Sequence, residues 1–239
     1  MQPYYISVLG DVLLLFSLPH ESEIKNALAK GDRCVILLPS LVADFRILGY
    51  EKCGKPLHDY YSAAVCAAVH LTERSGLPLS EISFETPQGI VEILRTGDGL
   101  FCVKVNKCKQ LLSKTVEIRG CETDVLDVDV GGKIRVVPTL DVARFDKATS
   151  ARLSSATLPL PSAVVLSARV GQRLLVRAYT DYNPTPPSSM LTFAAAAYSE
   201  CSLSGCNHLY FDDFSFCRVR YSTVEIAVKP NFITENNAV

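Results

Sequence analysis

One stretch of this chain, Asp59 to Leu71, constrains the fold more than any other. It reads DYYSAAVCAAVHL, in which alanine, valine and cysteine follow one another without a lysine or an arginine. Such a run predicts a helix that is buried on all sides, because it has no polar face to turn toward water. A helix of this kind needs a shell of other elements around it. The rest of the chain is therefore expected to supply that shell.

A second stretch of the same kind runs from Thr185 to Tyr198 and reads TPPSSMLTFAAAAY. We expect Thr185 to cap this helix and Pro186 to occupy its first turn. We expect Asp59 to cap the first helix, because a carboxylate there accepts free amide protons and suits the helix dipole. Two buried helices in one chain predict two halves, each organised around one of them.

The segments around the two helices repeat in the same order, which indicates an internal duplication. Each half has a strand broken by a turn, at Gly10-Asp11 in the first and at Gly131-Gly132 in the second. The predicted strands are 4–9, 12–18, 34–38, 45–50, 82–86, 89–95, 100–105, 125–130, 133–137, 163–167, 173–179, 214–221 and 224–229, and the predicted helices are 21–29, 60–74, 146–154 and 187–199.

The predicted fold class is therefore α+β, with two pseudo-symmetric halves. Residues 1–112 and 113–239 each form a curved mixed or antiparallel sheet wrapped around a buried central helix, and the final strands are able to pack on the first half. This arrangement would point the N-terminal ends of both helices at one shared cleft. Helix N-termini bind anions, so the cleft would suit a small carboxylate.

Composition excludes several classes of function. The formal net charge is −1 and the basic residues are scattered, which argues against a nucleic-acid partner. The nine cysteines lack zinc-finger spacing, and the cluster of Cys201, Cys206 and His208 is too loose, so we expect no metal and no cofactor. Reduced thiols favour the cytoplasm. Val8–Leu18 is too short to span a bilayer, so no membrane partner is expected, and the chain is expected to be a monomer or homodimer.

Several segments, taken in order, resemble the diaminopimelate epimerases. These segments are Val8–Leu13, Ala43–Tyr50 with Gly54, Phe84–Glu92, Val128–Gly132, Val176–Tyr179 and Ser188–Ala196. The resemblance covers most of the chain and implies the two-lobed fold of that family. It also implies cofactor-free inversion at the α-carbon of an amino acid.

In that family two cysteines face each other across the substrate and exchange the α-proton. The matching positions here are Tyr60 and Ser189, and neither carries a thiol. A serine hydroxyl is too weak an acid for this cycle, and tyrosine titrates near 10 when unperturbed. Two-thiol chemistry is therefore not expected. Other family positions have also changed: the loop asparagines match Asp11, Glu51 and Gly132, and a Glu-Arg pair matches Thr180-Asp181.

The chain also resembles the phenazine-biosynthesis-type isomerases, which share this fold without the thiols. Asn183-Pro184-Thr185 with Ser188 is similar to a segment of that family, and His58 lies near its helix-start histidine. In that family carboxylates and a histidine move protons. The resemblance implies such a set here, formed by Glu51, His58, Asp59 and Asp181. The alternative is that these residues are a cap, a loop charge and solvated side chains.

Three functional hypotheses stay open: a divergent isomerase, a non-catalytic binding protein for a small carboxylate or amino acid, and an assembly protein whose cleft is filled by its own side chains. An open pocket where a carboxylate and an imidazole converge would favour the enzyme. A pocket plugged by Tyr60 and Met190 would favour the other two. The candidate catalytic residues are Tyr60, Ser189, His58, Asp59 and Asp181, and the candidate ligand-binding residues are Asp11, Glu51, Ser62, Thr180, Thr185 and Ser188.

Overall fold

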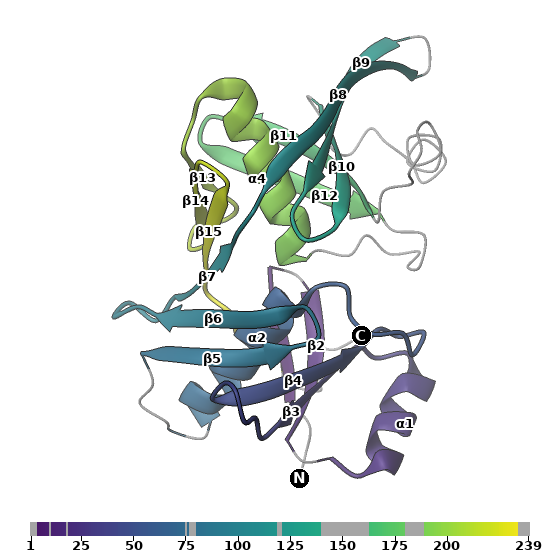
Figure 1. The fold of residues 1–239 in the computed structure, drawn as a ribbon, viewed down its shortest axis with the longest axis vertical. Coiled ribbons are helices and arrows are strands. Elements are labelled where there is room, and N and C mark those ends of the chain that lie inside the picture. The colour runs from purple at the N-terminus through teal and green to yellow at the C-terminus, as the bar shows by residue number, and fades with distance from the viewer. Residues whose placement is uncertain are drawn as a thin grey trace. The chain divides into compact units, whose positions relative to one another are not determined.

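The computed structural model describes residues 4–9, 11–17, 19–74, 76, 80–118, 121–139, 163–179 and 189–233. The chain has an α+β fold with a large mixed sheet and few helices (Figure 1). It divides into two compact units. Unit 1 contains Met1–Lys104 and Ala227–Val239, and unit 2 contains Val105–Ile226. In the part of the chain that is described, no helix is both long and apolar enough to cross a membrane.

Unit 1 has a mixed sheet whose strand order is β16-β1-β2-β3-β4-β5-β6-β7. The pairs β2/β3 and β4/β5 are parallel, and the remaining neighbours are antiparallel. The strands are β1 (Tyr4–Val8), β2 (Asp11–Ser17), β3 (Cys34–Leu38), β4 (Phe45–Tyr50), β5 (Glu81–Thr86), β6 (Gly89–Arg95), β7 (Phe101–Val105), which leads out of the unit, and β16 (Asn231–Ile233).

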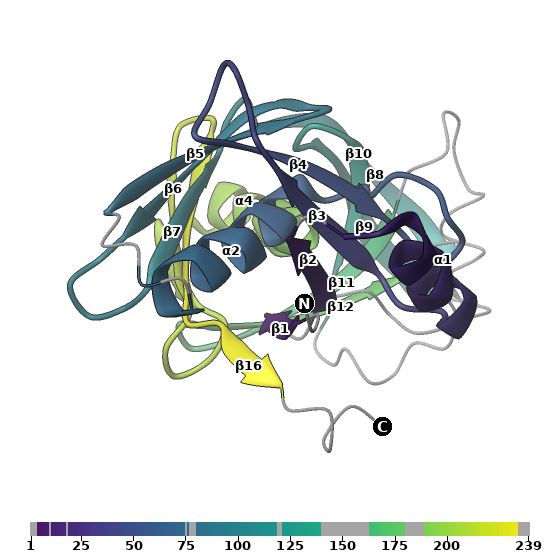
Figure 2. The same cartoon turned by 90° about the horizontal axis from the view of Figure 1, so that it is seen from below.

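The helix α2 (Tyr60–Val69) lies against β1, β2, β4 and β6, and Figure 2 shows it among the strands of its unit. Every residue of α2 except Tyr61 is buried, as its uniformly apolar sequence requires. A π-helical turn, η1 (His70–Arg74), continues it. The helix is therefore at the residues where the sequence predicted one.

The helix α1 (Glu21–Lys30) joins β2 to β3. Its N-terminus is closed by Glu23, which accepts a hydrogen bond from the backbone N–H of His20 at 2.9 Å. Its C-terminus is closed by Gly31, whose φ of 83° is left-handed and is readily adopted by glycine. Ala27 packs with Leu14, Phe16 and Cys34 in a small apolar cluster.

Unit 2 has a second mixed sheet, in the order β15-β14-β13-β12-β11-β10-β9-β8. Here β10/β11 and β12/β13 are parallel, whereas β8/β9, β9/β10, β11/β12 and β13/β14 are antiparallel. The strands are β8 (Lys109–Ile118), β9 (Cys121–Asp129), β10 (Lys133–Pro138), β11 (Ala163–Val170), β12 (Arg173–Tyr179), β13 (His208–Tyr210), β14 (Phe216–Arg220) and β15 (Thr223–Val228), which runs on into unit 1 at Ala227.

The helix α4 (Met190–Ser204) lies against β9, β10, β11, β12 and β14. It starts later and ends later than the predicted range of 187–199. Its N-cap is Ser189, which is extended (φ −141°, ψ 154°), so the prediction that Thr185 caps this helix is wrong. Ser189 is itself a strong capping residue, and it lies directly before the apolar run. At the other end the helix runs to Gly205, which is left-handed with φ 70°.

Candidate functional site

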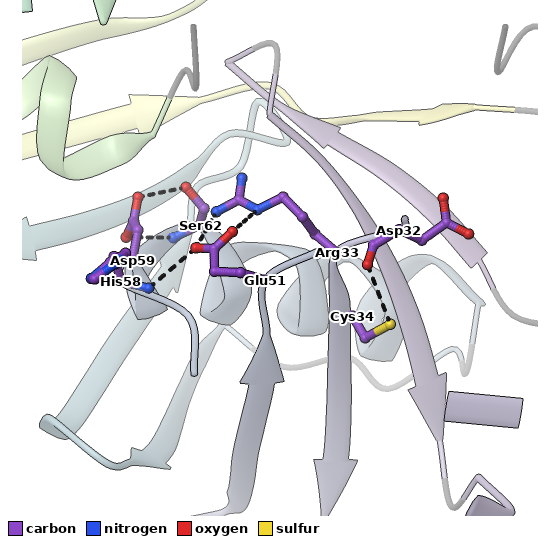
Figure 3. Close-up of polar contacts among 7 residues, drawn as sticks. All are labelled: Asp32, Arg33, Cys34, Glu51, His58, Asp59 and Ser62. Atoms are coloured by element: carbon purple, nitrogen blue, oxygen red, sulfur yellow. Dashed lines mark hydrogen bonds and ion pairs between the residues drawn. The ribbon is translucent and has the colours of Figure 1, made fainter. Parts of the chain in front are cut away.

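At the start of α2, a carboxylate caps the helix. Asp59 Oδ1 accepts the backbone N–H of Tyr61 at 2.8 Å. The same oxygen accepts the backbone N–H of Ser62 at 3.2 Å, and Oδ2 accepts the Ser62 hydroxyl at 2.8 Å (Figure 3). Asp59 and Ser62 are both buried. The prediction that Asp59 is the N-cap is confirmed. Amides that would otherwise attract a ligand carboxylate are therefore occupied by the chain's own carboxylate.

A second carboxylate, Glu51, lies close to this helix start at the end of β4. Its two oxygens accept Nε and Nη2 of Arg33 at 2.8 and 3.0 Å, a two-point pairing that fixes both side chains (Figure 3). The Arg33 side chain is 7% exposed and that of Glu51 is 17% exposed. Glu51 also accepts the backbone N–H of His58 at 3.3 Å. Glu51 thus ties the loop before α2 to the start of β3.

Tyr60, the first residue of α2, is 2% exposed. Burial raises the pKa of its phenol above the ordinary value of 10.0, and a backbone hydrogen bond at Gly49 opposes that shift only in part. Near neutral pH the phenol therefore keeps its proton, so Tyr60 is suited to donate a hydrogen bond and not to act as a base. Gly49 leaves no room for a side chain, because an added Cβ would lie 2.2 Å from Leu57 Cδ1.

The start of α4 is capped by hydroxyl groups. The Ser189 hydroxyl accepts the backbone N–H of Thr192 at 3.3 Å, and Thr192 Oγ1 accepts the backbone N–H of Ser189 at 3.1 Å. The Thr192 hydroxyl donates to the Ser189 carbonyl at 2.7 Å. Ser189 is buried and Met190 is fully buried. In this arrangement Ser189 serves as a neutral reciprocal cap.

The structure brings together Glu51, His58, Asp59 and Ser62 from the predicted set (Figure 3). His58 is exposed, and its carbonyl accepts the side-chain amide of Gln88 at 3.2 Å. The placement of the two helix starts at one cleft stays a prediction. Four other predicted residues lie outside the described residues, and for Asp11 only the backbone, at the start of β2, is described. These four are Thr180, Asp181, Thr185 and Ser188.

Arg33 is the residue of this cluster that the sequence analysis missed. It lies one position before the apolar strand β3, where a charge is normally solvated, yet it is buried. The available signal was weak: a basic residue next to a buried strand, and an acidic residue, Glu51, just after the neighbouring strand. Only the antiparallel pairing of β3 with β4, in which Cys34 lies opposite Tyr50, brings the two charges together.

The described residues contain no group of three or more His, Cys, Asp or Glu side chains arranged to hold a metal ion. The buried thiols are also poor nucleophiles. Burial raises the pKa of Cys34 and of Cys108 to about 11. Burial, with a contribution from Cys206, raises the pKa of Cys201 to about 12. Cys66, inside α2, is fully buried.

The mixed sheets and the strand order define the diaminopimelate epimerase-like fold, and solved structures share it over nearly the whole chain. One is a putative phenazine biosynthesis PhzC/PhzF protein from Clostridium difficile, with a TM-score of 0.76 and 13% identity, covering 97% of this chain and 96% of that one. Another is a hydroxyproline epimerase from Agrobacterium vitis with bound trans-4-hydroxy-L-proline, with a TM-score of 0.65, 11% identity and coverage of 98% and 91%.

A third is a methylitaconate-delta-isomerase, with a TM-score of 0.56, 10% identity and coverage of 97% and 93%. At these identities the likeness concerns the fold. The sequence matches no protein-family model and no curated protein. The chain therefore has the fold of this group of epimerases and isomerases, although its identity to the three structures is only 10–13%.

Proposed function

We propose that this chain is a divergent, cofactor-independent isomerase of the racemase and epimerase type. It acts on a small carboxylate-bearing molecule and does so without two-thiol chemistry. The observation that carries the proposal is the near-complete coverage of the chain by the folds of a hydroxyproline epimerase and a methylitaconate isomerase. Fold alone does not define function, so the argument also rests on the residues at the helix starts.

The strand pairing supports an internal duplication with pseudo-symmetric halves, each organised around its buried helix. In unit 1 the pairs from β1 to β6 run antiparallel, parallel, antiparallel, parallel, antiparallel. In unit 2 the pairs from β9 to β14 run in the same sequence. In each unit the helix, α2 or α4, lies between the fourth and fifth strands of this series.

Within this proposal the residues of the predicted set take different roles. His58 is exposed, and histidine is the residue type that most readily exchanges protons near neutral pH. His58 and Asp181 are therefore the proposed proton carriers. Asp59 and Ser189 hold the helix starts, and Tyr60 donates a hydrogen bond. Glu51 positions His58 through the backbone N–H that it accepts, and Arg33 fixes Glu51.

One observation favours a second candidate, a non-catalytic binding or assembly protein that kept the fold. Asp59 occupies the amides at the start of α2, and Tyr60 and Met190 are fully or almost fully buried at the first positions of their helices. When the chain's own side chains occupy the helix start, a substrate cannot bind to the amides there. This arrangement is expected of a protein that has no active site.

Incubation with a panel of amino acids and small carboxylates in deuterated water separates the two candidates. Trans-4-hydroxy-L-proline belongs in the panel. The isomerase incorporates deuterium at the carbon next to the carboxylate, measured by mass spectrometry. The His58→Gln variant should lower the rate at least tenfold, whereas His20→Gln, an exposed histidine at the start of α1, should not change it. Compounds that raise the melting temperature without exchanging deuterium would establish the non-catalytic candidate instead.

A further inference from the structure

The sheet of unit 2 carries a surface of arginine and aromatic side chains on β12, β13 and β14. Successive residues of a strand point to opposite sides. Leu209 and Cys217 are fully buried, so the residues beside them in β13 and β14 lie on the opposite, accessible side. We call this surface the basic aromatic face. It consists of Arg177, His208, Tyr210, Phe216, Arg218 and Arg220, and β13 joins it to β12 through the pairing of Tyr210 with Arg173.

The rings of this face form one connected cluster. Tyr210 lies opposite Phe216, and His208 lies opposite Arg218, in the antiparallel pair β13/β14. The His208 ring stacks on Phe216 with centroids 5.1 Å apart, and it lies 4.9 Å from the Tyr210 ring. The Arg218 guanidinium lies 5.9 Å from the centroid of Phe216. Tyr210 is 37% exposed, so the cluster presents an aromatic ring to solvent.

The arginines of the face are not neutralised. Arg177, Arg218 and Arg220 form no ion pair within the described residues. The carboxylates beside the face are engaged: Asp213 pairs with Arg173, and Asp212 accepts the backbone N–H groups of Phe214 and Ser215. Glu225, half-buried on β15, is the acidic side chain of the next strand. With Arg173 included, four arginines lie on or beside the face against the carboxylates of Asp212, Asp213 and Glu225, which leaves an excess of one positive charge.

An independent observation comes from Tyr221, in the turn after Arg220. Its φ is 52°, in the left-handed region that bulky residues rarely adopt, and its side chain is fully exposed. Any residue with a Cβ atom makes this turn less favourable than glycine would, and the fully exposed ring of Tyr221 does not pack against the chain to offset that cost. It is available to a partner outside the chain, next to the arginines of the face.

We propose that the basic aromatic face binds single-stranded nucleic acid. Arginines hold phosphates, and exposed aromatic rings stack on unpaired bases, a combination used by sheet surfaces that bind single strands. From Arg177 to Arg220 the face spans about 25 Å along the strands, which suits a short oligonucleotide. The sequence analysis expected no nucleic-acid partner because the basic residues are scattered. The sheet brings Arg177 of β12 to the same face as Arg218 and Arg220 of β14.

Fluorescence anisotropy with a fluorescein-labelled twelve-nucleotide oligouridylate tests this proposal on the full chain. If three phosphates are contacted, a plot of the logarithm of the association constant against the logarithm of the salt concentration should have a slope of roughly −2. In the Arg218→Ala/Arg220→Ala variant the slope should weaken by about 1.4, and the affinity at 50 mM salt should fall at least tenfold. The matched control, Lys30→Ala/Lys52→Ala, removes two exposed cations of unit 1 and should leave both unchanged.

Tyr221→Gly separates binding from stability. Glycine suits the left-handed turn, so the melting temperature should stay the same or rise, while the affinity falls about tenfold through loss of stacking. Three results would overturn the proposal. The first is that the chain does not bind the oligouridylate at 50 mM salt. The second is that heparin and unlabelled oligouridylate, at equal charge, compete equally well for the chain. The third is that the double arginine variant sediments differently from the wild type while its affinity for the oligouridylate is unaltered. The last result would assign the face to a second copy of the chain.

Discussion

The two units share a strand-pairing series but place their buried charges differently. Unit 1 has Asp59 and the Arg33–Glu51 pair at the start of its helix. Unit 2 caps its helix with the neutral Ser189 hydroxyl, and its buried charge lies within the sheet, where Asp127 on β9 pairs with Arg135 on β10. Because a carboxylate cap cancels the positive end of a helix and a hydroxyl does not, the α4 start is the better place for an anionic ligand.

The largest effect that tests this contrast is expected in the sheet of unit 2. Arg135 is completely buried, and its Nε and Nη2 donate to Asp127 at 2.7 and 3.0 Å. Asp127→Asn removes the charged carboxylate with which this buried guanidinium pairs, and should lower the free energy of unfolding by about 4 kcal/mol. Urea unfolding measures this. Asp124→Asn, an exposed position on the same strand, should change it by less than about 0.5 kcal/mol.

A smaller effect is expected at the two helix starts. Asp59→Ala removes a buried carboxylate that accepts three hydrogen bonds, and should cost about 2 kcal/mol of unfolding free energy. Ser189→Ala removes a single acceptor from the Thr192 amide and should cost about 1 kcal/mol. Urea unfolding measures both losses of unfolding free energy. If the two variants lose the same amount, the charged cap does not stabilise its helix more than the neutral cap does.

The charge contrast should also appear in ligand binding. Asp59→Asn keeps a capping side chain but removes the negative charge, which makes the α2 start resemble the α4 start. We expect a small carboxylate that binds the wild type in the deuterium-exchange panel to bind about threefold to tenfold more tightly to this variant, measured by calorimetry. Asp124→Asn makes the same change in net charge elsewhere. If it improves binding equally, the effect comes from overall charge and not from the helix start.

The smallest effect is a pH dependence of the Asp127–Arg135 pair. Burial opposes ionisation of Asp127, but the hydrogen bonds and charges of Arg135 and Lys133 outweigh it and lower the pKa below the ordinary 3.8. The pair therefore stabilises the fold fully above that value and loses its contribution as the pH falls below it. The difference in unfolding free energy between wild type and Asp127→Asn should shrink between about pH 4 and pH 2. A difference that is constant over this range would contradict the assignment.

The sequence was most informative where one property decided the structure. The apolar runs within Asp59–Leu71 and Thr185–Tyr198 predicted the two buried helices, and Asp59 was correctly predicted to cap the first of them. It was least informative where two segments had to meet. Arg33 is buried only because β3 pairs with β4. The side chains of β8 are mostly exposed and alternate little, so its sequence does not indicate a strand. It is a strand because β9 pairs with it. Thr185-Pro186 is a general signal for a helix start, and Ser189 competes with it locally.

The path of the chain through the two units has a consequence for how the protein is made. Unit 2 is one continuous stretch, whereas unit 1 is closed by β16, in which Ile233 pairs with Tyr5, a residue that precedes all of unit 2 in the sequence. On a ribosome, unit 2 is complete before β16 emerges, so we expect it to reach its native state first, even though synthesis of unit 1 begins earlier. The first strand then waits for its outer neighbour until all of unit 2 has been synthesised.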